Sequence, residues 1–191
     1  MCYMDKTYII AEIGVNHDGR LNRAKLLVDQ AIQAGADAVK FQTFKTDQLV
    51  SSMAPKAKYQ LETTNKGETQ RDMLKKLELP SKYFVALKGY CDQAGVDFIS
   101  TPFDESSAEF LESIGVSSYK IASGEITNLP LVELIASYGK PMIVSTGMCS
   151  LGEIEEALVT IQNGSVKTAV VLLHCLSNYP APIQEINLKS I

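Results

Sequence analysis

The chain has 191 residues, of which 46% are hydrophobic and 21% charged, and this composition indicates a globular domain with a sizeable core rather than a disordered chain. Its formal net charge of −4 leaves no basic stripe to neutralise phosphates, which excludes nucleic acid as a partner. We find no signal peptide, no bilayer-length apolar run and no CxxC pair among the four cysteines, so we expect a cytoplasmic protein with reduced thiols and no membrane partner.

Apolar runs that predict strands alternate along the chain with patterns that predict helices. The six predicted strands span residues 8–12, 38–43, 96–100, 118–122, 141–146 and 168–175. The predicted helices span residues 21–34, 69–77, 81–94, 104–114, 128–138 and 150–162, and a further helix begins at 187–191. Strands separated by helices pair in parallel through right-handed crossovers, which indicates an α/β protein. We expect the long connection at 44–80 to cover the substrate, with a plain surface insertion as the alternative.

Polar side chains recur where the predicted strands end, and this favours a TIM (β/α)8 barrel over an open sheet. A barrel brings all strand ends to one mouth, and the first strand is not followed by the GxGxxG loop of a dinucleotide-binding sheet. Since about six of the eight strands are found, we expect residues 1–191 to be an incomplete N-terminal portion of a barrel. The polar residues at these ends are Glu12, Lys40, Gln42, Ser100, Lys120, Ser123, Ser145, His174 and Ser177.

Two lysines, Lys40 and Lys120, lie inside strand patterns from which lysine is usually excluded. A buried lysine needs a counter-charge to keep its proton. With Ser123 and Ser145 nearby, the pair suits a bound phosphate, because lysine supplies charge and serine supplies hydrogen bonds. The alternative is that each lysine forms an ion pair with a structural carboxylate.

Two carboxylates and two histidines complete the set of candidate residues. Glu12 ends the first predicted strand and Glu125 follows a Ser-Gly pair, so either can act as a general base or hydroxyl anchor, or can be structural. His17 follows the first strand in a polar turn, and we expect it at the mouth, whereas a strand histidine such as His174 is more often a core residue. The two histidines form no metal-binding motif.

Six segments in this order resemble the sialic acid synthase family, which includes N-acetylneuraminate, legionaminate and pseudaminate synthases. They are AEIGVNHDG, AVKFQTF, FISTPFD, YKIASGE, KPMIVSTGM and LLHCLSNYPAP, and they run over nearly the whole chain. The resemblance implies a TIM barrel that transfers phosphoenolpyruvate onto an open-chain N-acetylated hexosamine, typically N-acetylmannosamine. The products are a nine-carbon 2-keto sugar acid and phosphate, which is released by C–O cleavage.

The same resemblance implies roles for individual residues. The expected catalytic residues are Glu125, which handles the proton of water or a hydroxyl, Glu12, which contacts sugar hydroxyls, and Lys120. Either Ser177 or Asn178 is expected to reach the phosphate, since some members have an asparagine where this chain has Ser177. The other expected substrate-binding residues are Lys40, Gln42, Ser123, Ser145, Tyr179 at the sugar site and, by a looser match, Asn65.

The resemblance further implies a divalent metal, Mn²⁺ or Mg²⁺, and a homodimer. Because the family's metal-binding histidines lie in later strands, we expect no metal ligand within this chain, which would be inactive alone. The final strands and a small C-terminal antifreeze-like domain, which covers the neighbouring subunit's site, are also expected to be absent. Two alternatives stay open: a Schiff-base aldolase barrel that uses Lys120 or Lys40 on a keto acid, and a catalytically inert barrel fragment.

Overall fold

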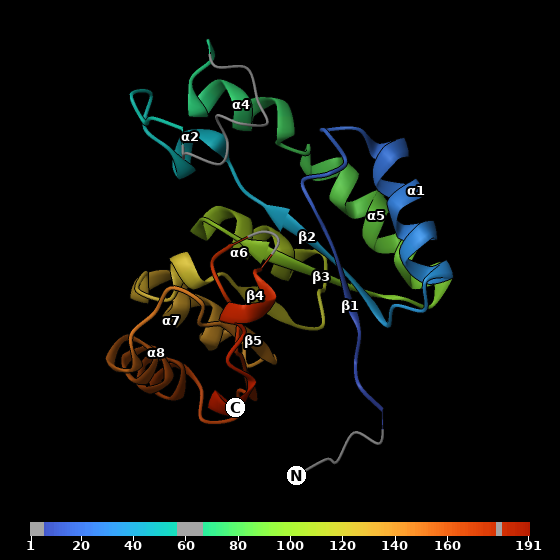
Figure 1. The fold of residues 1–191 in the computed structure, drawn as a ribbon. Coiled ribbons are helices and arrows are strands. Elements are labelled where there is room, and N and C mark those ends of the chain that lie inside the picture. The colour runs from blue at the N-terminus through green and yellow to red at the C-terminus, as the bar shows by residue number, and fades with distance from the viewer. Residues whose placement is uncertain (1–5, 57–66, 179–180) are drawn as a thin grey trace. The chain divides into compact units, whose positions relative to one another are not determined.

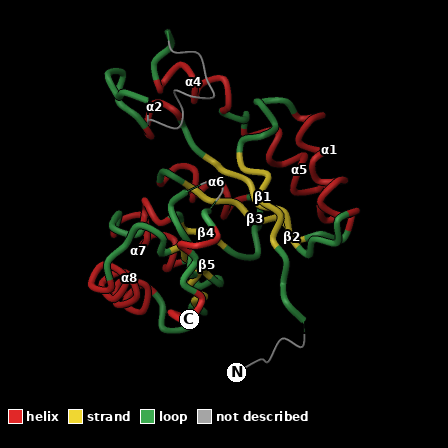
Figure 2. Tube along the Cα trace, in the orientation of Figure 1, coloured by secondary structure: helices red, strands yellow, loops and turns green. Residues whose placement is uncertain are grey.

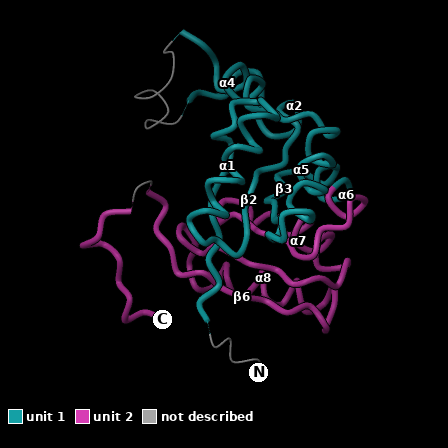
Figure 3. Tube along the Cα trace, turned by 90° about the vertical axis from the view of Figure 1, so that its right-hand side faces the viewer, with its two compact units in different colours: residues 1–110 teal, residues 111–191 magenta. Residues whose placement is uncertain are grey.

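The computed structural model describes residues 6–56, 67–178 and 181–191. The chain forms two compact units, Met1–Phe110 and Leu111–Ile191, shown in different colours in Figure 3. Strands and helices alternate in each unit, which confirms the predicted α/β class. None of the helices in these three described stretches is both long and apolar enough to cross a membrane.

The first unit is built on three parallel strands that pair in the order β1, β2, β3. These strands are drawn in yellow in Figure 2. Helices α1 and α5 lie side by side along these strands (Figure 1). Phe41 of β2 and Phe98 of β3 stack with ring centroids 5.4 Å apart, and both are buried in the core. The bounds are β1 Ile10–Gly14, α1 Leu21–Gln33, β2 Ala38–Thr43, α5 Ser81–Ala94 and β3 Asp97–Pro102.

Strand β1 begins and ends two residues later than predicted. The backbone N–H of Ile9 donates to the Asp37 carboxylate, and the Ile9 carbonyl accepts from the backbone N–H groups of Asp37 and Ala38. Residue 9 is therefore tied to the turn before β2, and strand pairing starts only at Ile10. As a result Glu12 lies in the middle of β1, so the expectation that it ends the strand is wrong.

In its described residues, the long connection after β2 holds the helices α2 (Thr46–Leu49) and α4 (Gln70–Leu77). Helix α4 confirms the prediction, but α2 was not predicted. Its start is fixed from a distance, because the Glu78 carboxylate accepts hydrogen bonds from the Thr46 backbone N–H (3.1 Å) and hydroxyl (2.7 Å). Residues 57–66 of this connection lie outside the described residues.

The second unit repeats the pattern with parallel strands β4, β5 and β6. Helices α7 and α8 lie side by side, and Ser150 and Glu153 form the predicted capping box that starts α8. Strand β6 is shorter than predicted, and the final segment forms short 3-10 turns rather than an α-helix. The bounds are β4 Tyr119–Ile121, η1 Ser123–Glu125, α7 Leu129–Ser137, β5 Met142–Ser145, α8 Leu151–Gly164, β6 Val170–Leu173, η2 Ile183–Glu185 and η3 Leu188–Ser190.

Helix α6 (Glu105–Ser113) follows β3 and contains the boundary between the units. The predicted cap, Asp104, accepts hydrogen bonds from the Ser107 backbone N–H (2.7 Å) and hydroxyl (2.8 Å). It also accepts from the backbone N–H of Lys45, 2.8 Å away, and so ties the connection after β2 to the start of α6. The side chain of Asp104 is buried, which makes this a fixed point of the first unit.

Candidate active site

In the first unit, Glu12 and Lys40 face each other across β1 and β2. They are direct partners in the strand register, and the Lys40 ammonium forms an ion pair with Oε2 of Glu12. The Lys40 side chain is 12% exposed and that of Glu12 is 40% exposed, so the lysine is largely enclosed while the carboxylate faces solvent. The counter-charge that a strand lysine requires is thus supplied by another predicted site residue.

The second oxygen of Glu12 lies above the backbone of Gly14. The register of β1 against β2 shifts between these two residues, and Gly14 has a positive φ of 55°. A β-carbon at Gly14 would lie 2.9 Å from Oε1 of Glu12 and 3.8 Å from Nε2 of Gln42. The missing side chain therefore leaves the space in which this carboxylate and this amide lie, as glycine at a bulge often does.

His17 is buried rather than placed at a mouth, so that expectation is wrong. Its side chain is fully enclosed, and its ring stacks on Phe41 with centroids 6.2 Å apart. Nδ1 accepts a hydrogen bond from the Gly19 N–H at 3.0 Å, and Nε2 has no hydrogen-bond partner among the described residues. Burial lowers the pKa of His17 to about 4, so the ring is neutral at physiological pH.

In the second unit, Lys120 and Ser145 come together as predicted. Lys120 lies at the centre of β4 and is buried, and its ammonium donates to the Ile121 carbonyl at 2.7 Å and to the Ser145 hydroxyl. Ser145 is the last residue of β5. A lysine ammonium and a hydroxyl that meet on adjacent parallel strands can donate together to an oxyanion.

The turn after β4 carries Ser123 and Glu125. The Glu125 carboxylate accepts a hydrogen bond from the Asn128 side-chain amide at 3.0 Å, and the Ser123 carbonyl accepts from the Cys149 thiol at 3.3 Å. Burial raises the pKa of Cys149, which keeps it protonated as a donor. Neither partner was predicted: Asn128 could have been found from its spacing three residues after Glu125, whereas Cys149 lies in a distant loop and gives no sequence signal.

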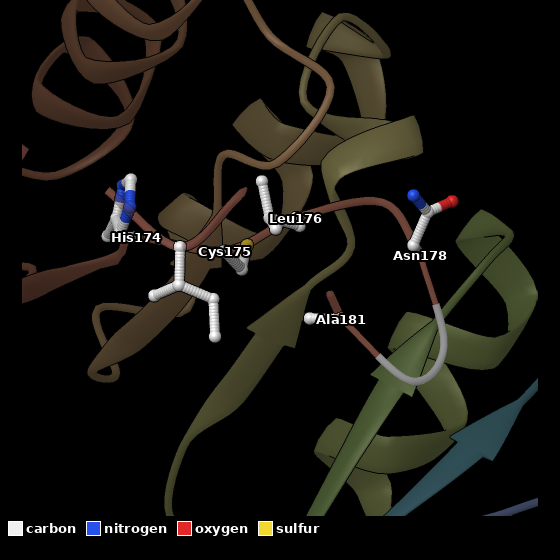
Figure 4. A pocket seen from close by; sticks show the side chains of 6 residues that line it. His174, Cys175, Leu176, Asn178 and Ala181 are labelled. Atoms are coloured by element: carbon white, nitrogen blue, oxygen red, sulfur yellow. The ribbon is translucent and has the colours of Figure 1, made fainter. Parts of the chain in front are cut away.

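A pocket of about 310 Å³ follows β6 (Figure 4). Asn178 lines it, whereas Ser177 is not among its lining residues. His174 also lines the pocket and is exposed just beyond the end of β6, so its expected place in the core is wrong. Two other predicted residues, Tyr179 and Asn65, lie outside the described residues.

A protein site for a divalent metal requires a cluster of donor side chains. Across residues 6–56, 67–178 and 181–191, no group of three or more His, Cys, Asp or Glu side chains could hold an ion. The described residues therefore do not fit the implied metal, and we assign no chemical step to it.

The sequence matches known proteins along most of its length. The family model described as the NeuB family matches residues 27–191. The N,N′-diacetyllegionaminic acid synthases of Campylobacter jejuni and Legionella pneumophila are 50% and 49% identical over 98% and 96% of this chain, which covers 57% and 52% of their lengths. The N-acetylneuraminate-9-phosphate synthase of Homo sapiens is 32% identical over 96% of the chain. The chain thus spans about half the length of the relatives it matches.

Solved structures give the same result for the fold. The N-acetylneuraminic acid synthetase of Leptospira borgpetersenii, in complex with citrate, aligns over 98% of this chain and 60% of its own with a TM-score of 0.83 and 34% identity. A DAHP synthase of Thermotoga maritima aligns with a TM-score of 0.63 at 15% identity, which is a likeness of fold alone. These alignments confirm the predicted fold class, the first six strands of a TIM-type barrel.

Proposed function

Because the chain belongs to the NeuB family, we propose that it is the part of a synthase that condenses phosphoenolpyruvate with an open-chain N-acetylated amino sugar. The observation that carries the proposal is the buried Lys120 ammonium of β4, which is hydrogen-bonded to the Ser145 hydroxyl at the end of β5. Burial strengthens a charged donor towards a phosphate or carboxylate, because water competes less for it. A small metabolic acid that carries both a phosphate and a carboxylate is the class of ligand that suits Lys120 and Ser145.

The acceptor sugar is proposed to carry two acetamido groups. The two relatives named as N,N′-diacetyllegionaminic acid synthases are about half identical to this chain, whereas the human N-acetylneuraminate-9-phosphate synthase is 32% identical. Phosphoenolpyruvate supplies three carbons and no nitrogen, so both acetamido groups of such a product must come from the six-carbon acceptor. N-acetylmannosamine, with one acetamido group, is the second candidate.

In the second unit, Lys120, Ser123 and Ser145 are proposed to bind phosphoenolpyruvate. The Lys120 ammonium already donates to the Ser145 hydroxyl, so the two donors are pre-oriented rather than ordered on binding. Pre-orientation reduces the entropy lost when the ligand binds. Ser177 or Asn178, of which only Asn178 lines the pocket after β6, is a further proposed phosphate contact.

In the first unit, Lys40 is proposed as a further contact to phosphoenolpyruvate and Glu12 as an acceptor for sugar hydroxyls. Oε2 of Glu12 is held by Lys40, while Oε1 lies over Gly14, and the Glu12 side chain is 40% exposed to solvent. A carboxylate oxygen is a strong acceptor for a hydroxyl. Gln42, Tyr179 and Asn65 are proposed substrate contacts on the basis of the family match alone.

The proposed reaction balances without redox change. C3 of phosphoenolpyruvate forms a bond to the aldehyde carbon of the sugar, water adds to C2, and the C2–O bond to phosphate breaks. Glu125 is proposed to take the proton from that water or to deliver one to the new hydroxyl. The Asn128 amide holds one carboxylate oxygen of Glu125 in place, which leaves the other for this proton transfer.

The proposal extends to a cytoplasmic homodimer that uses Mn²⁺ or Mg²⁺, on family grounds. The direct test measures phosphate release from phosphoenolpyruvate by the full-length protein with a panel of N-acetylated hexosamines. We expect sugar-dependent release, fastest with a diacetamido hexose. Borohydride inactivation in the presence of pyruvate, without phosphate release, would instead identify a Schiff-base aldolase. A full-length protein that shows neither phosphate release nor borohydride inactivation would be catalytically inert.

A further inference from the structure

We propose that the turn between β1 and α1, residues 14–20, positions the Glu12 carboxylate, and that Gly14 and His17 are its two positioning residues. The turn would set the affinity for the acceptor sugar without touching it. This inference rests on the proposed function, because it assigns Glu12 to the sugar. It adds two residues, neither of them a member of the Glu12–Lys40–Gln42 cluster.

The turn is tightly wound and held by its own backbone. Three hydrogen bonds close it in succession: Asn16 N–H to Ile13, Asp18 N–H to Val15 and Arg20 N–H to His17, at 3.0, 3.1 and 2.9 Å. Gly14, Asp18 and Gly19 have positive φ values of 55°, 49° and 68°. Asp18 takes up this conformation without being a glycine, which occurs where the surrounding structure dictates the backbone.

The far side of the turn is packed against the end of the long connection. A β-carbon at Gly19 would lie 2.7 Å from the backbone carbonyl of Lys76, so the two backbones are in close contact. The turn is therefore fixed on one side by Lys76 and on the other by β2. A segment fixed on two sides can transmit a fixed geometry to the strand that enters it.

His17 connects the turn to β2 directly beneath the polar cluster. Its ring stacks on Phe41, the residue between Lys40 and Gln42, and Phe41 is also the register partner of Gly14. Nδ1 accepts a hydrogen bond from the backbone N–H of Gly19 at 3.0 Å. The neutral, enclosed ring therefore holds the Gly19 end of the turn against the strand that carries Lys40.

Gly14 sets the space available to the Glu12 carboxylate. Because a β-carbon there would lie 2.9 Å from Oε1, Gly14→Ala must displace the carboxylate and disturb its pairing with Lys40. Gly35 provides a matched control, since its φ is also positive, at 83°, but a β-carbon there meets nothing within 4 Å. Both substitutions strain the backbone, and only Gly14→Ala moves Glu12.

The first experiment compares Gly14→Ala with Gly35→Ala in the full-length protein by steady-state kinetics. We expect Gly14→Ala to raise the KM for the sugar about ten- to hundredfold, and to raise the KM for phosphoenolpyruvate, which Lys40 is proposed to contact, by a smaller factor. Gly35→Ala should leave both KM values unchanged. Equal KM values for the sugar in the two variants would overturn the proposal.

The second experiment asks whether the effect acts through Glu12. In a double-mutant cycle, Gly14→Ala should add little to the KM for the sugar once Glu12 is already Gln, because the same contact has been lost. Full additivity would show that Gly14 acts by another route and would overturn the proposal. If the wild type is active and Glu12→Gln leaves the KM for the sugar unchanged, the assignment of Glu12 to the sugar is wrong instead.

The third experiment keeps the proposal testable if Gly14→Ala does not fold. His17→Asn keeps an acceptor for the Gly19 N–H, whereas His17→Leu removes it and leaves that N–H unpaired. We expect a larger rise in the sugar KM for His17→Leu than for His17→Asn, with no change in the KM for phosphoenolpyruvate. A lowered Tm with both KM values unchanged would show that His17 is only structural. A wild type that releases no phosphate with any sugar would count against the proposed function instead.

Discussion

Lys120 occupies a strand position that a parallel sheet normally gives to an apolar side chain. Both of its neighbours in β4, Tyr119 and Ile121, are buried core residues, and Lys120 itself is buried between them in the chain. Two of its hydrogen-bond partners, the Ser145 hydroxyl and the Ile121 carbonyl, are neutral. A buried ammonium attracts an anion more strongly than an exposed one, because water screens its charge less.

We predict that Lys120→Ala weakens phosphoenolpyruvate binding by roughly ten- to hundredfold, the value of one charge-assisted contact. Calorimetric titration of the full-length protein measures this directly. Lys140→Ala is the matched control, because Lys140 belongs to the same unit but pairs with Glu112 at 2.6 Å. Unchanged affinity in Lys120→Ala would exclude the phosphate assignment, and an equal loss in Lys140→Ala would show a general effect of charge.

For Glu125, we predict that Glu125→Gln abolishes most turnover while phosphoenolpyruvate binds almost normally. The substitution keeps the shape of the side chain and removes its ability to accept a proton. Rapid-quench turnover combined with titration separates the two effects. Glu155→Gln, at an exposed position of α8, serves as the control. If Glu125→Gln turns over at the wild-type rate, Glu125 has only a structural role, through its hydrogen bond with Asn128.

At the level of elements, the Glu78 carboxylate holds the start of the short helix α2. Glu78 accepts two hydrogen bonds from Thr46 and lies near Lys75, 3.2 Å away. Burial raises the pKa of Glu78, but these donors outweigh it and hold the pKa below its ordinary value of 4.5. A carboxylate whose pKa is lower in the folded state stabilises the protein above the unfolded pKa and loses this effect as the pH falls through the folded pKa.

We therefore predict that Glu78→Gln lowers the free energy of unfolding at pH 7, and that its difference from wild type shrinks as the pH falls below about 4.5. Urea denaturation between pH 7 and pH 3.5 checks both parts. The exposed Glu155→Gln should differ little from wild type throughout. A difference that stays constant down to pH 3.5 would mean that Glu78 acts by packing and not by charge.

The elements that were predicted correctly are those whose signals are local. Helix α8 is an example, since Ser150 and Glu153 stand three residues apart in the sequence. Helix α2 was missed because its start depends on Glu78, 32 residues away, as the Thr46 hydroxyl contact shows. Likewise β1 was placed too early, because the Asp37 side chain binds the Ile9 backbone.

The same distinction holds for the candidate site. Lys120 and Ser145 could be predicted because parallel strand ends meet at one edge, whatever the details of packing. The bulge at Gly14 and the burial of His17 could not, because they depend on how the register of β1 shifts against β2. No periodicity in the sequence records such a shift.

For the whole molecule, fold and function rest on different observations. The barrel architecture is shared with a DAHP synthase at 15% identity, so it does not by itself specify an acceptor. The family assignment covers residues 27–191, and the chain spans about half the length of its relatives. The substrate assignment therefore depends on the Lys120 and Glu12 clusters and on chemistry measured in the full-length protein.

The most direct test of the central claim, a phosphoenolpyruvate-dependent condensation, follows ¹⁸O from the bridging oxygen of phosphoenolpyruvate by ³¹P NMR. The full-length protein is incubated with this substrate and a diacetamido hexose. We predict sugar-dependent phosphate that carries the ¹⁸O label, because the C2–O bond breaks. Phosphate without the label, or release that does not depend on the sugar, would contradict the account.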